Sequence, residues 1–304
     1  MSVNVFRVHV PATSANLGPG FDCLALSLDL WNHTTFRVTG NRYLAQIQGE
    51  GEACLPVDEK NLIIHSFFLG LDYLEIPIPP GVEISCRNHI PASSGLGSSA
   101  AAVLTGLMAA NCFANFPLSH REILGVALKL EGHPDNMSAA LLGGLVVVAL
   151  EEGNCIPHKY AIAPLHIAIV LPQIEIPTTT ARAILPEHYT RQDIVYNLGR
   201  VALVIEALRS GDIDLLQKTM RDRLHQPYRL PYIPGAQSAI QAAGQFNCAV
   251  SLSGAGPGLI CITKEDPRQM AQVMEIEFRK NGIPSKTWFL SPTVQGAWIE
   301  TNPN

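Results

Sequence analysis

The chain has 304 residues, of which 47% are hydrophobic and 15% are charged, so it can bury the core of one large domain or of two medium ones. Its formal net charge is -5 and it has no cluster of Lys and Arg, which argues against binding nucleic acid through a basic surface. No apolar run reaches the ~18–20 residues that a membrane-spanning helix needs.

The cysteines and the first residues indicate the compartment. Seven cysteines are scattered along the chain without a C-x-x-C pair. An odd, unpatterned set is typical of reduced thiols in a cytosolic protein. The N-terminus also lacks the charged segment and the apolar segment of a signal peptide. We therefore expect a cytoplasmic location, no membrane partner and no nucleic-acid partner.

The first predicted strand, residues 3–10, runs into a turn. Residues 11–22 read PATSANLGPGFD, where Gly18-Pro19-Gly20 reverses the chain between Asn16 and Asp22. Alone, this pattern is typical of a capped loop. Further strands are predicted at residues 33–39 and 44–48, and a helix is predicted to begin at residues 58–61 and to end before Pro77.

A loop of small residues follows the next predicted strand, which includes residues 82–86. Residues 91–102 read PASSGLGSSAAA, and a helix is predicted to continue to about residue 114. A strand, a small-residue loop and a helix N-terminus often hold phosphate, because glycines let the backbone approach and free N–H groups donate to the anion. Two interpretations stay open: a phosphate loop, or a Gly/Ser turn before a buried helix.

Two better-known phosphate loops do not fit residues 91–102. The Walker pattern fails because it requires a lysine that is absent. The dinucleotide pattern G-x-G-x-x-A is present, but the glycines lie too far from the strand and no acidic residue follows about twenty positions on. No Lys, Arg, Asp or Glu occurs from Asn88 to His120, so a bound polyphosphate would depend on backbone dipoles and a metal ion.

A dense polar cluster, residues 131–136 (EGHPDN), follows another predicted helix and precedes an apolar strand at residues 145–150. Charged and polar groups rarely gather between apolar segments without a use, although a solvated turn between helices is the alternative. The pattern is then interrupted across residues 151–163. We expect two domains, residues 1–157 and 158–304.

The second half of the chain mixes helices and strands. Strands are predicted at 166–171, 248–252, 258–263, 286–290 and 297–301, and helices at 191–209, 213–224, 235–245 and 267–281, with a short helix carrying Arg182. Residues 253–258 (SGAGPG) form a second glycine-rich loop. Because the elements do not alternate as β-α-β, the expected class is α+β in two lobes.

Three segments together are more specific than any one of them. Residues 11–22, 91–102 and 253–258 resemble, in order and approximate spacing, the three motifs of the GHMP small-molecule kinases. Within that superfamily the chain is most similar to the homoserine kinases, through residues 16–22 (NLGPGFD), 131–136, 180–186 (TARAILP) and 226–229 (QPYR). The resemblance covers nearly the whole chain.

This resemblance implies a fold and a reaction. The N-terminal lobe would resemble the ribosomal-S5-like domain and the C-terminal lobe a ferredoxin-like sandwich, with the active site between them. ATP and Mg²⁺ would be cosubstrates, and the γ-phosphate would pass to the side-chain hydroxyl of L-homoserine to give O-phospho-L-homoserine, a step toward threonine. A homodimer stays open.

The resemblance also implies site residues, position by position. ATP would lie beside Asn61 and on Pro91, Ala92, Ser93, Ser94, Gly95, Leu96, Gly97, Ser98 and Ser99. Mg²⁺ would bind Ser99 and Glu131. Homoserine would contact Asn16, Asp22, His133, Asp135, Arg182 and Arg229, and the catalytic residues would be Asn16, Asn136 and Arg182. Asp22 suits an ammonium group, and the two arginines suit a carboxylate.

The expected mechanism is direct in-line transfer without a strong general base. Some superfamily members place a lysine and an aspartate at the reacting hydroxyl, whereas here the first motif has no lysine and Asn136 replaces the base. Positioning, Mg²⁺ and loop N–H groups would then supply the catalysis. One departure is Gly258, where relatives usually carry Thr or Ser.

Two alternatives differ in class. Another GHMP kinase, such as a mevalonate kinase, would share the central loop, but its acceptor needs no ammonium partner. A non-catalytic binding protein of the same fold would be favoured by loss of Ser99 or Glu131, and both are present.

Overall fold

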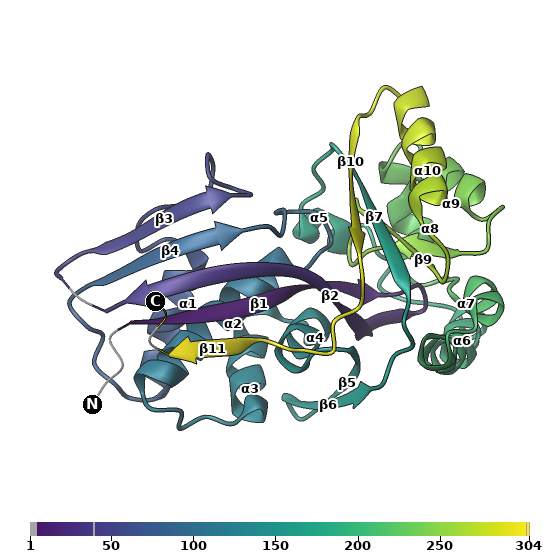
Figure 1. Cartoon of the computed structure of the whole chain (residues 1–304). Helices are drawn as coiled ribbons and strands as arrows, with labels where there is room; N and C mark the ends of the chain where they lie inside the picture. Colours follow the sequence, from purple (N-terminus) through teal and green to yellow (C-terminus); the bar gives the residue numbers. More distant parts are fainter. Residues whose placement is uncertain (1–4, 39, 302, 304) are drawn as a thin grey trace.

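Two sheets, one in each lobe, form the frame of the molecule (Figure 1). The computed structural model describes residues 5–38, 40–301 and 303. Residues 3 and 4 of the first predicted strand and Thr39 of the second therefore lie outside the described residues. Among the described residues, no helix combines the length and the apolar character needed to cross a membrane.

The first sheet has the order β11-β1-β2-β4-β3, and β5 pairs with both β2 and β6. Its strands are β1 (Val5–Asn16), β2 (Gly20–Arg37), β3 (Tyr43–Gly49), β4 (Val82–Asn88), β5 (Leu145–Glu151), β6 (Asn154–Tyr160) and β11 (Trp298–Thr301). β1 and β2 form a long antiparallel hairpin closed by the Gly18-Pro19 turn, where Asn16 and Gly18 have φ angles of 70° and 79°. This hairpin places the first motif at one end of the sheet.

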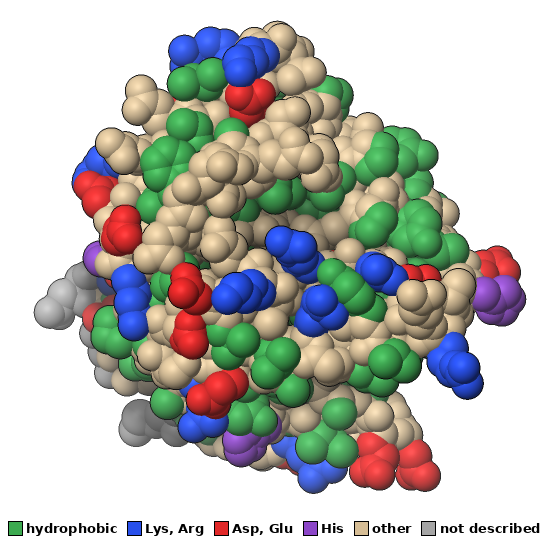
Figure 2. All heavy atoms as spheres, turned by 90° about the vertical axis from the view of Figure 1, so that its right-hand side faces the viewer, with side chains coloured by type: hydrophobic (Ala, Val, Ile, Leu, Met, Phe, Trp, Pro, Cys, Tyr) green, Lys and Arg blue, Asp and Glu red, His purple; other side chains and the backbone are tan. Residues whose placement is uncertain are grey.

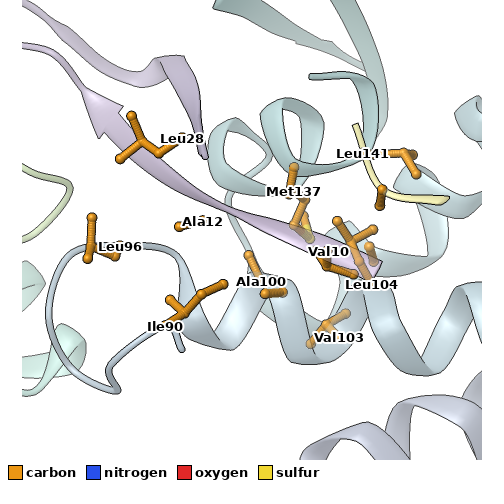
Figure 3. Packing of buried hydrophobic residues seen from close by; sticks show 14 of the residues in the cluster. Val10, Ala12, Leu28, Ile90, Leu96, Ala100, Val103, Leu104, Met137 and Leu141 are labelled. Carbon is orange, nitrogen blue, oxygen red and sulfur yellow. The ribbon is translucent and has the colours of Figure 1, made fainter. Parts of the chain in front are cut away.

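Four helices cover one face of this sheet: α1 (Leu62–Tyr73), α2 (Ser98–Phe113), α3 (His120–Glu131) and α4 (Asp135–Leu142). α2 is almost wholly buried and consists largely of small residues. Figure 3 shows Val10 of β1 close to Leu104 of α2 and to Met137 of α4, within the same core cluster as Ala12 and Ala100. The helix that starts at the small-residue loop is therefore fixed by core packing, which holds its N-terminus in place.

The second sheet is antiparallel, with the order β10-β7-β9-β8. Its strands are β7 (His166–Pro172), β8 (Ala249–Leu252), β9 (Leu259–Thr263) and β10 (Ser285–Leu290), and it packs against α9 (Ala236–Ala243) and α10 (Arg268–Lys280). The remaining helices are α5 (Thr178–Ala183), α6 (Arg191–Ser210), α7 (Ile213–Thr219), α8 (Gln226–Arg229) and the short η1 (Leu230–Tyr232). The α+β class in two lobes is confirmed.

One predicted helix, residues 213–224, was too long. α7 ends at Thr219 because Asp222 turns the following chain: its carboxylate accepts the N–H groups of Leu224, His225 and Gln226 at 2.8, 2.8 and 2.6 Å. An aspartate that bonds nearby backbone N–H groups competes with the helical pattern.

We propose residues 1–157 and 158–304 as the two domains, with two exceptions at their border. Residues 158–160 continue β6 of the first sheet, and β11 returns from the end of the chain to pair with β1 of the same sheet, so that the yellow β11 lies beside the purple β1 in Figure 1.

Candidate active site

A cavity of about 720 Å³ lies where the three motifs meet. It is lined by all but two of the residues that the sequence predicted: Asn16, Asp22, Asn61, Ala92, Ser93, Ser94, Gly95, Gly97, Ser98, Ser99, Glu131, His133, Asp135, Asn136, Arg182 and Arg229. The exceptions are Pro91 and Leu96, which are buried behind the loop. Figure 3 shows Leu96 on the loop that precedes α2, close to Ile90.

The two loop glycines are required by the protein's own packing. Gly97 is the N-cap of α2 with φ 71°, and a Cβ there would lie 2.2 Å from the Thr13 hydroxyl oxygen. Gly95 has φ +79°, and a Cβ there would lie 2.0 Å from the Ser253 carbonyl oxygen. Both φ values also disfavour any side chain. The sequence predicted that these glycines leave room for a triphosphate and allow backbone angles that a side chain disfavours, but it did not predict the contacts with Thr13 and Ser253.

Hydrogen bonds join the first and third motifs to the loop across the two lobes. The Ser253 hydroxyl lies 2.7 Å from the Gly95 carbonyl and 2.8 Å from the Ser14 hydroxyl. The Asn16 amide donates to the Gly254 carbonyl at 2.7 Å and accepts from the Asp22 N–H at 3.0 Å. Asn16 therefore fixes the site wall, besides any contact that it makes with a substrate.

A candidate metal position lies at the start of α2. The Ser99 hydroxyl donates a hydrogen bond to the Glu131 carboxylate, which comes from the end of α3. Among the described residues there is no group of three or more His, Cys, Asp and Glu side chains that could hold a metal ion alone. One carboxylate and one hydroxyl nevertheless fit Mg²⁺, which keeps several waters and takes phosphate oxygens as ligands.

One end of the cavity is apolar and suits a purine. Ile47, Leu55 and Ile63 line it together with Asn61, the N-cap of α1. The Asn61 side chain accepts from Ile63 N–H at 3.0 Å and donates to the Pro56 carbonyl at 2.8 Å. Its amide therefore holds the helix start, and its place near the adenine stays a prediction.

The opposite end gathers the charges. Asp22 accepts two hydrogen bonds from Arg182, at 2.8 and 3.1 Å. The buried Arg229 donates to the Ala181 carbonyl at 3.0 Å, and both guanidinium groups lie over the Phe21 ring at 6.0 and 5.4 Å. Burial, and then the nearby charge of Arg182, lower the pKa of Arg229.

The polar cluster of residues 131–136 supplies the wall between these two ends. Burial, and then the charge of Asp22, raise the pKa of Asp135 to about 6. Its Oδ1 accepts the Asn136 N–H at 2.7 Å and lies 4.0 Å from His133 Nδ1. The Asn136 side-chain oxygen accepts the Thr13 hydroxyl at 2.7 Å, so its carbonyl already has a partner.

The sequence did not point to a buried network behind the acceptor end. Asn197 donates to the Pro19 carbonyl at 3.1 Å and to the Asp222 carboxylate at 2.7 Å. The His225 Nε2 donates to the Gly18 carbonyl at 2.8 Å, and its Nδ1 lies 3.3 Å from an Arg229 Nη1. The run of polar residues between α7 and residues 226–229 was the feature of the sequence that could have indicated this network. Two threonines were also left without a site role by the sequence: Thr179 lines the cavity, and the buried Thr13 donates to the lining residue Asn136.

These features define a class of protein. A two-lobed α+β fold with a helix N-terminus that opens onto a cavity, a Ser–Glu pair and a small charged pocket is consistent with a small-molecule kinase. Models of the GHMP kinases N-terminal domain and the GHMP kinases C-terminal domain match residues 61–144 and 204–280.

Known proteins narrow this class. A homoserine kinase from Desulfitobacterium hafniense is 38% identical over 298 residues, 96% of this chain and 99% of that protein. The crystal structure of homoserine kinase from Cytophaga hutchinsonii superposes with a TM-score of 0.86 at 29% identity, covering 98% of each chain. The chain belongs to the homoserine kinase family of the GHMP kinases. A mevalonate kinase from L. major shares the fold at 17% identity, covering 96% of each chain with a TM-score of 0.68.

Proposed function

We propose that this protein is a kinase that transfers the γ-phosphate of ATP to the side-chain hydroxyl of L-homoserine, giving O-phospho-L-homoserine on the way to threonine. The carrying observation is the charged pocket beside the phosphate loop, where Asp22, Arg182 and Arg229 converge. A mevalonate or a sugar has no ammonium group for Asp22. Ser99 and Glu131 are both present, which argues against a binding protein without activity.

ATP would lie with its base at the apolar end and its phosphates on the loop. The first turn of α2 presents free N–H groups and the positive end of the helix dipole, and this matters because residues 88–119 contain no Lys or Arg. Ser99 and Glu131 would hold Mg²⁺, which would neutralise phosphate charge when bound. The fixed loop would keep the γ-phosphate facing the acceptor end.

The acceptor would enter as a zwitterion. Its ammonium group would pair with Asp22, and its carboxylate with Arg182 and Arg229. The Asp22–Arg182 pair must then open or shift, so the amino acid would replace one ion pair by two. This exchange favours a substrate that carries both charges, because an unpaired charged group in a partly buried site is costly.

The phosphoryl step would not require a strong base. The homoserine oxygen would attack the γ-phosphorus while the bond to the bridging oxygen of ADP breaks, and the hydroxyl proton would pass late in this loose transition state to an oxygen of the transferred phosphoryl group and from there to water. Asn136 is held by Thr13 and cannot accept a proton as a carboxylate does. The chain's own contribution would be to align the hydroxyl, through Asn16 and Arg182, and to surround the phosphoryl group with fixed donors.

We propose a cytoplasmic location and a homodimer as well. All seven cysteines are unpaired thiols, five of them buried, as suits a reducing compartment. The homodimer is supported by an exposed apolar face on α6.

The experiment that tests the proposed activity is a phosphate-transfer assay with Mg-ATP and homoserine, mevalonate, galactose or threonine. Homoserine is expected to be the preferred acceptor, and 1,4-butanediol, which keeps the hydroxyl but lacks both charges, should fall by more than tenfold in kcat/KM, because each unpaired charged partner costs ~1–3 kcal/mol or more. Equal turnover of butanediol would exclude amino-acid recognition, and a preference for mevalonate would favour the alternative kinase.

A further inference from the structure

Arg229 is a buried cation that forms no ion pair with a carboxylate of the described residues. It ends α8, is 2% exposed, and still lines the cavity. Asp22 pairs with Arg182 instead, and Asp222 lies against His225. Figure 2 shows the side of the molecule that carries α6 and α7, where other Lys and Arg side chains stand at the surface and are solvated by water. A buried charge needs polar partners in place of water, so the groups that hold Arg229 decide how it meets an anion.

Two neutral groups hold the guanidinium of Arg229. Its Nε donates to the Ala181 carbonyl at 3.0 Å, and its Nη1 lies 3.3 Å from Nδ1 of His225. No described residue accepts from Nη2, so the N–H groups of that nitrogen stay available to a ligand in the cavity. The place of the His225 ring therefore sets the direction in which the free side of the guanidinium points.

The contacts of the other ring nitrogen fix the tautomer of His225. Nε2 lies 2.8 Å from the Gly18 carbonyl oxygen and 3.5 Å from a carboxylate oxygen of Asp222. Both of these oxygens are acceptors, so Nε2 carries the hydrogen and Nδ1 presents its lone pair to Arg229, which can only donate. A hydrogen on both nitrogens would bring two donors face to face. Burial also lowers the pKa of His225, so the ring is neutral.

The same buried network holds the turn of the first motif. His225 and Asn197 bind the two carbonyls of Gly18-Pro19, at 2.8 and 3.1 Å. Asn197 also donates to the Asp222 carboxylate at 2.7 Å. Because this turn leads directly to Asp22, one set of side chains supports both the proposed ammonium partner and Arg229. Support of this kind keeps two binding groups at a fixed spacing.

We propose that His225 is a positioning residue for the carboxylate of the acceptor: as a neutral imidazole held by Asp222 and the Gly18 carbonyl, it fixes Arg229 so that Nη2 faces that carboxylate. His225 does not line the cavity, so it acts through Arg229 and not by touching the substrate. The inference rests on the proposed function, because the carboxylate is that of homoserine.

The first test measures the state of the His225 ring in the parent protein by long-range proton–nitrogen NMR near pH 7. The signals are assigned by their loss in His225→Asn. A neutral ring with its hydrogen on Nε2 is expected. Arg229→Met should shift the Nδ1 resonance and leave Nε2 protonated. A hydrogen on Nδ1, or an Nδ1 resonance that does not respond to the loss of Arg229, would overturn the proposal.

Two substitutions of His225 separate the two bonds of the ring. His225→Gln can keep a donor for the Gly18 carbonyl but lacks the acceptor at the place of Nδ1, whereas His225→Asn can keep that acceptor and is too short to reach Gly18. His225→Gln should raise KM for homoserine by about tenfold, with a smaller change in kcat and an unchanged KM for ATP. His225→Asn should retain more of the affinity for homoserine. A larger loss for Asn than for Gln would contradict a role through Arg229.

A second acceptor is the matched control for this role. 3-Aminopropan-1-ol keeps the hydroxyl and the ammonium group of homoserine at the same spacing and lacks the carboxylate. Its kcat/KM should be low for the parent protein and should fall no further for His225→Gln. An equal fold-loss for both acceptors would show that His225 acts on the fold as a whole, and would overturn the positioning role. A parent protein that does not phosphorylate homoserine would refute the proposed function and the carboxylate assignment with it, whereas the NMR measurement would still support or contradict the contact between His225 and Arg229.

Discussion

The two ends of the candidate active-site cavity are built to meet charge by different means. The nucleotide end is built from backbone: the loop before α2 contributes glycines, serines and a helix N-terminus, and residues 88–119 contain no Lys, Arg, Asp or Glu. The acceptor end is built from side chains, with the Asp22–Arg182 pair and the buried Arg229. The difference would suit the proposed ligands, because a triphosphate would bring its own metal ion and a small zwitterion would not.

The two ends of the cavity should therefore tolerate different substitutions. Backbone recognition depends on a few φ angles and on close contacts, so it is sensitive to an added Cβ. Side-chain recognition depends on paired charges, so it is sensitive to loss of one partner.

The largest effect is expected at the acceptor end, for Arg182→Ala. The change removes the cation beside Asp22 and one proposed partner of the substrate carboxylate. The value of kcat/KM for homoserine should fall by about 10²- to 10³-fold, because the bound substrate would desolvate this pair, whose side chains are 37% and 33% exposed without it. The affinity for ATP, measured without homoserine, should change little. Arg42→Ala is the control, because Arg42 forms an exposed pair with Glu83 away from the cavity. Equal losses for both ligands would contradict a role restricted to the acceptor.

The next largest effect is expected for Glu131→Gln, at the boundary between the two ends. The amide keeps the size of the side chain and removes the charge that Mg²⁺ requires, so activity at limiting Mg²⁺ should fall by about 10- to 100-fold and recover partly at high Mg²⁺. Ser99→Ala should have a smaller effect, because water can replace a neutral ligand. Titrating activity against Mg²⁺ is the measurement, and unchanged activity with a normal fold would remove Glu131 from the metal site.

How much the sequence predicts also differs between the two ends. The loop before α2 has a local signature, because glycines, serines and a helix start are adjacent in the chain, and the structure places them at one cavity as predicted. The partners of those glycines, Thr13 and Ser253, come from distant segments. Sequence alone could not supply these contacts because they depend on how the two lobes meet.

At the acceptor end the sequence predicts which residues converge but not how they pair. Asp22 and Arg182 were expected to bind opposite ends of an amino acid, and in the structure they bind each other. The hydrogen bonds of Asp222, which end α7 before the predicted residue 224, could not be predicted from hydrophobic periodicity. They depend on Asn197 and on backbone N–H groups that only the folded chain brings to Asp222. The residues of the acceptor site were assigned from the resemblance to a known family and not from a local sequence pattern.

A smaller effect, on the stability of the protein, is expected at the nucleotide end, where the loop is built from backbone groups. Gly97→Ala adds a Cβ that would lie 2.2 Å from the Thr13 hydroxyl at φ +71°. The variant should lose roughly 1–3 kcal/mol or more of unfolding free energy, and nucleotide binding should weaken because the loop must shift. This differs from the behaviour of an open loop, which would lose binding alone.

Gly153→Ala is the matched control for this prediction. Gly153 has φ +78° and open space where a Cβ would lie, so it isolates the cost of the backbone angle from the cost of the contact. Melting temperatures of both variants, with and without Mg-ATP, make the comparison. If the two variants lose the same stability, the contact with Thr13 does not matter.

The smallest effect is expected at the acceptor end, where side chains provide the charges, and it is a change in how stability depends on pH. Burial and the charge of Asp22 raise the pKa of Asp135 from 3.8 to about 6, so the folded protein binds this proton more tightly than the unfolded chain does. The resulting stability is present below about pH 4 and is lost as the pH rises through about 6. Asp135→Asn keeps a neutral oxygen for the Asn136 N–H and cannot ionise. The variant should therefore gain about 1–3 kcal/mol relative to the parent protein at pH 7.5 but little at pH 4. Urea unfolding at both pH values is the measurement, and a gain of equal size at both would show that ionisation of Asp135 costs the folded protein nothing.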